Sequence, residues 1–93
     1  GTYSIENNVD IFDEATNRFR AFPNPVNEKV VLESSNIGFL SLKITDIYSN
    51  LIYVETFPEN KVTIPLDNWP SGIYLISAKM KDGSSGTIKL VKL

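Results

Sequence analysis

The 93-residue chain contains neither cysteine nor histidine. Without cysteine it forms no disulfide and no thiolate metal site, and without histidine it lacks the commonest general base and the commonest nitrogen ligand for metals. Thiol chemistry and Ser-His hydrolysis are therefore excluded, and we expect neither an enzyme nor a cofactor. The missing cysteines do not identify the compartment, because many exported bacterial proteins fold without disulfides.

Long apolar runs and a strong charge of one sign are also missing. No apolar stretch approaches the roughly 18–20 residues that a membrane span requires, so we expect no membrane insertion. Nine basic and eleven acidic residues, mixed along the chain, give a formal net charge of −2. This balance provides no electrostatic footprint for nucleic acid or anionic lipid. The remaining composition, 42% hydrophobic and 11% aromatic, is that of one small globular domain.

The first 17 residues form an acidic segment, with four Asp or Glu residues and no Lys or Arg. Its apolar residues are scattered, so the segment cannot bury much surface. We interpret residues 1–17 as a linker and residues 18–93 as the folded domain. Val9, Ile11 and Phe12 are the linker residues that we expect to contact the domain.

Residues 71–80 give the clearest signal for an interior strand. They are β-branched, aromatic and aliphatic, and turn residues bound them at both ends. Period-two alternation places Tyr74, Ile76, Ala78 and Met80 on one face. Tyr74 follows the loop at residues 66–72, an arrangement that resembles the tyrosine corner of immunoglobulin-like sandwiches, in which the hydroxyl bonds to upstream backbone.

Further strands follow from β-rich stretches separated by Gly, Pro, Asn and Ser. We predict them at residues 18–22, 28–34, 39–46, 51–56, 61–65 and 87–93. In residues 39–46 the inward side chains should be Leu40, Leu42 and Ile44, and the following hairpin should place Asn50 at positive φ. No stretch of useful length shows helical periodicity. About seven strands at this spacing predict an all-β fold, a single immunoglobulin-like antiparallel β-sandwich.

Two sets of side chains resemble a chemical site. The turn carboxylates are Asp46, Glu59, Asp67 and Asp82, but turn Asp and Glu mostly cap backbone, and no calcium-ligand spacing is present, so we expect no metal. The aromatic residues that might serve as a platform for sugar are Tyr48, Tyr53, Phe57 and Trp69. A tryptophan in a loop before a core strand more often packs over the edge of a sandwich.

Four short motifs occur in a fixed order within residues 18–93. They are Phe22-Pro23-Asn24-Pro25-Val26, Leu42-Lys43-Ile44-Thr45-Asp46, Gly72-Ile73-Tyr74-Leu75-Ile76 and Ile88-Lys89-Leu90-Val91-Lys92-Leu93. In this order and spacing they resemble the type A C-terminal sorting domain of the type IX (Por) secretion system of Bacteroidetes. The chain departs from that family at Ser49-Asn50, where a glycine followed by lysine or a similar residue is usual. This departure concerns the type of hairpin.

The resemblance implies a small immunoglobulin-like sandwich at the extreme C-terminus of an exported protein, with Leu93 as the natural terminus. Such a domain directs a larger cargo protein through the type IX outer-membrane translocon. Its implied partners are the translocon, its shuttle components and a sortase-like cysteine peptidase that cleaves in the linker. The implied destination, reached through the periplasm, is the cell surface or the extracellular space.

The residues that the resemblance assigns to translocon recognition come from three of the motifs. They are Pro23, Asn24, Pro25, Val26, Gly72, Tyr74, Lys89, Leu90, Val91, Lys92 and Leu93. In the last strand we expect Ile88 and Leu90 to pack on the core and Lys89 and Lys92 to project outward. The alternative function is an immunoglobulin-like accessory or carbohydrate-binding module of a surface enzyme. The Pro-Asn-Pro turn and the tyrosine corner would also serve folding alone.

Overall fold

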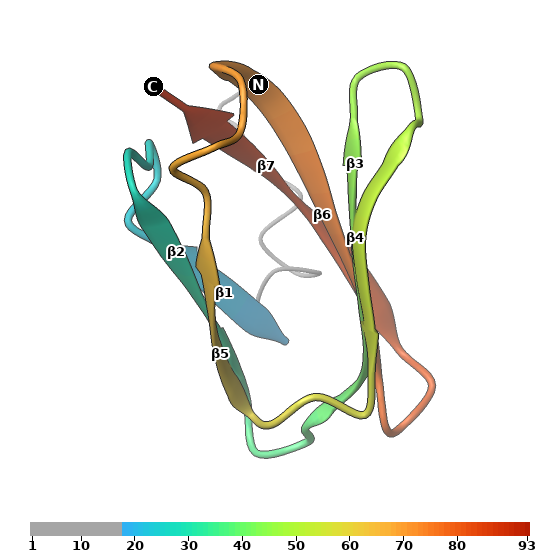
Figure 1. The fold of residues 1–93 in the computed structure, drawn as a ribbon. Coiled ribbons are helices and arrows are strands. Elements are labelled where there is room, and N and C mark those ends of the chain that lie inside the picture. Colours follow the sequence, from blue (N-terminus) through green and yellow to red (C-terminus); the bar gives the residue numbers. More distant parts are fainter. Residues whose placement is uncertain (1–17) are drawn as a thin grey trace, which may run out of the picture.

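A computed structural model describes residues 18–93 as a sandwich of two antiparallel sheets (Figure 1). The linker prediction concerns residues 1–17, which lie outside the described residues. The seven strands of the described part are β1 (Phe19–Phe22), β2 (Lys29–Ser34), β3 (Phe39–Asp46), β4 (Leu51–Thr56), β5 (Lys61–Pro65), β6 (Gly72–Met80) and β7 (Ser85–Lys92). The predicted all-β sandwich is confirmed.

The sheets have three and four strands, in the orders β1-β2-β5 and β4-β3-β6-β7. The chain changes sheet between β2 and β3, between β4 and β5, and again between β5 and β6. β6 pairs with β3 on one side and β7 on the other, as its apolar sequence predicted. Because β7 is an edge strand, its outer backbone groups need other partners.

The hydrophobic core lies between the two sheets. All four residues predicted for the inward face of β6 are buried: Tyr74, Ile76, Ala78 and Met80. They belong to one cluster with buried side chains from the three-stranded sheet and its connections, among them Phe19, Val26, Val30, Leu32, Ile64 and Leu66. Fully burying one such aliphatic side chain is worth about 1.5–3 kcal/mol, so this cluster is the main stabilising element of the fold.

The first residues of β3 depart from the predicted alternation. Phe39 is fully buried and packs edge-on against Phe19, with ring centroids 5.8 Å apart, whereas Leu40 is only half-buried. The pairing with β6 shifts register between Phe39 and Ser41. A bulge of this kind inserts one residue and reverses the face of those before it, which a strict period of two cannot anticipate. Leu42 and Ile44 are buried as predicted.

Strand boundaries follow the prediction closely except at β7. The bounds of β3, β4 and β5 agree with it, and β1, β2 and β6 each begin one residue later than predicted. β7 begins at Ser85 because Gly86 pairs with Ala78 and Ser85 with Lys79. The turn therefore shrinks to residues 81–84, where the Asp82 carboxylate accepts hydrogen bonds from the Ser84 N–H at 2.9 Å and the Ser84 hydroxyl at 2.6 Å.

The turn between β3 and β4 is organised by Asp46. Its Oδ1 accepts from the N–H groups of Tyr48 and Asn50, both at 2.9 Å, and its Oδ2 accepts from the Asn50 side-chain amide at 3.0 Å. The residue at positive φ is Ser49, with φ of 69°, so the prediction for Asn50 was wrong. Asn50 instead supplies the side chain that bonds back to Asp46. The expectation that turn carboxylates cap backbone is confirmed for Asp46 and Asp82.

Candidate recognition surface

Three separate motifs meet at one end of the sandwich. In the β6–β7 ladder Gly72 pairs with Lys92 and Tyr74 with Leu90, and Val26 forms a parallel bridge to Lys92. The chain's C-terminus, the loop before β6 and the β3–β4 turn all lie at this end (Figure 1). The structure thus brings together residues that are far apart in the sequence.

Asn24 fastens the Pro-Asn-Pro turn to the last strand. Its side-chain Nδ2 donates to the Lys89 carbonyl at 2.8 Å, and its Oδ1 accepts from the Val91 N–H at 3.0 Å. A primary amide presents one donor side and one acceptor side, so it pairs with a strand edge as a neighbouring backbone would. Pro23 and Pro25 on either side of it are exposed.

Val26 continues the same attachment through its backbone. Its N–H donates to the Val91 carbonyl at 2.8 Å, and its carbonyl accepts from the Leu93 N–H at 2.9 Å, while its side chain is fully buried. Asn24 and Val26 together satisfy the outward backbone groups of the end of β7. An edge strand covered in this way is protected from unspecific pairing. We call residues 23–26 and 89–93, joined by these four hydrogen bonds, the terminal clamp.

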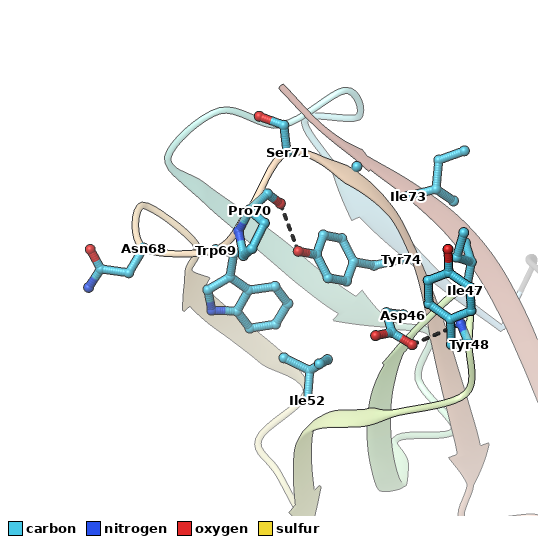
Figure 2. A pocket seen from close by; sticks show the side chains of 11 residues that line it. Asp46, Ile47, Tyr48, Ile52, Asn68, Trp69, Pro70, Ser71, Ile73 and Tyr74 are labelled. Carbon is cyan, nitrogen blue, oxygen red and sulfur yellow. Dashed lines mark hydrogen bonds between the residues drawn. The ribbon is translucent and has the colours of Figure 1, made fainter.

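Tyr74 forms the predicted tyrosine corner, which is thereby confirmed. The Tyr74 ring is buried at 6% exposure, and its hydroxyl donates to the Pro70 carbonyl at 2.7 Å (Figure 2). Trp69 packs beside it, with ring centroids 5.1 Å apart, and is partly buried against the core as expected for an edge tryptophan. Two residues before the tyrosine, Gly72 has a φ of +150°, and a Cβ there would meet no heavy atom within 4 Å. The backbone conformation, rather than lack of space, requires glycine at this position.

The terminal residues divide between the two faces of β7 differently from the prediction. Lys89 is exposed and Leu90 is buried, as expected, and Ile88 packs against the core. Lys92, however, is only 8% exposed, so the prediction that it projects outward was wrong. The period of two places residue 92 on the same side as Leu90. Its ammonium donates to the Leu93 carbonyl at 2.9 Å, and Leu93 itself is 63% exposed.

An apolar cleft of about 520 Å³ adjoins the corner. Ile47, Tyr48 and Ile52 from the β3–β4 hairpin line it together with Trp69 and Tyr74 (Figure 2). Sequence reasoning missed this cleft. The available signal was the run of apolar residues around the Ser49-Asn50 turn, where solvent-exposed hairpins are usually polar.

The four aromatic residues considered for a sugar platform do not assemble. Tyr48 and Trp69 line the cleft, but Phe57 follows the far end of β4 and is 74% exposed. Tyr53 packs against the core and donates to Glu55, and burial together with this bond raises the pKa of Tyr53 to about 12. Within residues 18–93, no three His, Cys, Asp or Glu side chains gather as a metal site would require. In the same residues, no helix is long and apolar enough to cross a membrane.

The match to a family model decides between the two functions. Residues 20–92 match the model of the secretion system C-terminal sorting domain, which covers most of the chain. The chain belongs to this family. The sorting domain is a C-terminal secretion signal of the type IX system, a class of domain that is not catalytic, and a carbohydrate-binding module is not favoured. No curated protein matches the chain.

Membership of the family accounts for the order of the motifs, and the structure accounts for their proximity. Belonging to it implies interaction with the type IX secretion system and export to the cell surface or extracellular space. The matched region begins at Arg20, within β1, and ends at Lys92, the last residue of β7. The terminal clamp therefore lies inside the matched region except for its last residue, Leu93.

Proposed function

We propose that the translocon recognises this sorting domain at the end of the sandwich that carries the terminal clamp. The observation that supports this proposal is the convergence of residues 23–26, Gly72 and residues 89–93 on one end of the fold, although they lie far apart in the sequence. Of these, Pro23, Asn24, Pro25, Gly72, Lys89 and Leu93 are exposed. A partner can contact only the exposed residues, while Val26, Tyr74, Leu90 and Lys92 hold those residues in place.

Lys89 is the central residue of this proposed surface. Its carbonyl accepts from Asn24 while its side chain remains exposed, so the clamp fixes its backbone and leaves its charge accessible. A long cationic side chain on a fixed backbone suits a partner that carries carboxylates. Leu93, at the end of the same clamp, offers an exposed apolar side chain.

The proposed processing step occurs within residues 1–17. A sortase-like cysteine peptidase would cleave there after export by way of the shuttle components, and leave the cargo at the cell surface or in the medium. The segment is acidic, with scattered apolar residues, which favours access by a peptidase over the paired strands of the sandwich.

A fusion experiment tests both parts. Residues 1–93 are joined to a fluorescent protein that carries an N-terminal export signal, and produced in a type IX-competent bacterium and in a derivative without the translocon. We expect fluorescence on the surface or in the medium of the competent strain alone. The mass of the released cargo should place the cut within residues 1–17. Equal export by both strains, or a cut within residues 18–93, would contradict the proposal.

A further inference from the structure

The outer face of the four-stranded sheet combines lysines with hydroxyl groups. The strand register places Lys43 beside Ser77 and Ser77 beside Thr87, and Lys79 lies one row further along β6. Other hydroxyl-bearing residues on this face are Ser41, Thr45, Thr56 and Ser85. None of the residues that these described strands direct outward is acidic.

A trough of about 530 Å³ crosses this face. Its lining includes Lys43, Lys79, Ser77 and Thr87. Within residues 18–93 the observed ion pair is Arg20–Glu33, which belongs to the other sheet. The lysines of the trough are therefore not neutralised by a carboxylate of the described domain. We call this surface the lysine trough.

The acidic segment joins the domain close to this trough. Residues 1–17 contain four carboxylates and no basic residue. The next residue, Arg18, donates from Nε to the Ser84 hydroxyl at 3.2 Å, and Ser85 lines the trough. An extended chain spans about 3.3–3.6 Å per residue, so Asp13 and Glu14 reach no further than about 18 Å from Arg18. Only a few strand residues separate Ser84 from the trough lysines, so the carboxylates of Asp13 and Glu14 are close enough to reach them.

We propose that residues 1–17 dock on the lysine trough and place their carboxylates against Lys43 and Lys79. Each exposed ion pair is weak by itself. A short tether, however, raises the effective concentration of the segment at the trough to the millimolar range, so weak pairs suffice. The Debye length falls from about 10 Å at 0.1 M salt to about 3 Å at 1 M, so the docked state is lost at high salt.

Docking on the trough restrains the segment in which we place the processing site. A peptidase then has to compete with the sheet for its substrate, and that consequence rests on the proposed function. The docking itself does not depend on the proposed function, and the experiment that tests it uses no peptidase.

The test uses the full chain, in which the absence of cysteine allows a single introduced thiol to be labelled. Asn8→Cys creates a single thiol for a nitroxide label and leaves all four carboxylates of the segment intact. At 20 mM salt, docking broadens the amide signals of Ser77, Lys79 and Thr87 at least threefold more than those of Val31 and Thr63 on the other sheet. At 0.5 M salt the difference disappears.

Charge reversal supplies the matched comparison. Lys43→Glu with Lys79→Glu should abolish the broadening on the trough, whereas Lys29→Glu with Lys61→Glu, which alters exposed lysines of the three-stranded sheet, should leave it unchanged. Even broadening over both sheets overturns the proposal. So does broadening confined to the apolar cleft and insensitive to salt. Broadening of unlabelled chains by labelled ones, in a mixture, assigns the contact to a second molecule and also overturns it.

Discussion

At the scale of single residues, the corner depends on one hydroxyl. The Tyr74 hydroxyl bonds to the Pro70 carbonyl from a nearly buried ring. Tyr74→Phe removes the donor and keeps the ring, so we expect a loss of about 0.5–1.5 kcal/mol in the free energy of unfolding. The midpoint of urea-induced unfolding measures this loss of stability. Tyr48→Phe, on a ring that is 78% exposed, is the control and should leave the midpoint unchanged. An equal midpoint for Tyr74→Phe and the wild type would exclude a stabilising corner.

Asn24 makes a second residue-scale prediction. Asn24→Ala removes two hydrogen bonds to β7, and because the site is exposed we expect a loss near the lower end of about 1–2 kcal/mol. The Val91 amide, which donates to Asn24, should exchange with solvent faster while amides of β6 stay protected. Asn36→Ala, in an exposed loop, is the matched control. Unchanged protection of Val91 would show that the side chain does not hold the strand.

The sequence predicted residues whose environment depends on local alternation or on a familiar turn. Tyr74 and the inward residues of β6 are examples, because a period of two and a preceding loop are visible along the chain. It did not predict that Asn24 would bond to Lys89 and Val91, since those contacts form between segments 65 and 67 residues apart. Lys92 was predicted to project outward because lysine is charged, although its spacing of two residues from Leu90 places both side chains on the same face of the strand.

At the scale of elements, the β3–β4 hairpin responds to pH through Asp46. The side-chain and backbone hydrogen bonds from Asn50, with that from the Tyr48 N–H, hold the pKa of Asp46 below its ordinary value. A lowered pKa in the folded state means that protonation opposes folding. The contribution to stability is therefore complete above about pH 3.9, the usual pKa of Asp, and is lost as the pH falls through the lowered value.

We expect the Tyr48 and Asn50 amide signals to shift together along a titration whose midpoint lies below the ordinary Asp value. The shared shift should vanish in Asp46→Asn. Asp67→Asn, in the exposed loop before β6, is the control and should preserve it. A midpoint at or above the ordinary value would contradict the cap.

Element boundaries show what limits prediction at this scale. The starts of β3, β4 and β5 were predictable because Gly38, Asn50 and Asn60 stand directly before them in the sequence. The bulge in β3 and the early start of β7 were not, because both depend on the register with β6. The fold class was nevertheless secure, since it rests on the number and spacing of strands rather than on their end residues.

At the scale of the whole molecule, the two ends of the sandwich have different surfaces. One end gathers the terminal clamp, the tyrosine corner and the apolar cleft. At the other, Arg18 contacts the β6–β7 turn, close to the lysine trough. Lys89 links the two regions, because it follows Thr87 of the trough by two residues on the same outward side of β7.

The most direct test of the account is the export of a fluorescent cargo carrying Lys89→Ala, compared with Lys61→Ala on the opposite sheet. Both lysines are exposed, so each change should alter stability by no more than about 0.5 kcal/mol, which melting curves of the purified domains verify. The account predicts that Lys61→Ala is exported like the wild type and that Lys89→Ala accumulates in the periplasm. Normal export of a folded Lys89→Ala variant would contradict recognition at the terminal clamp.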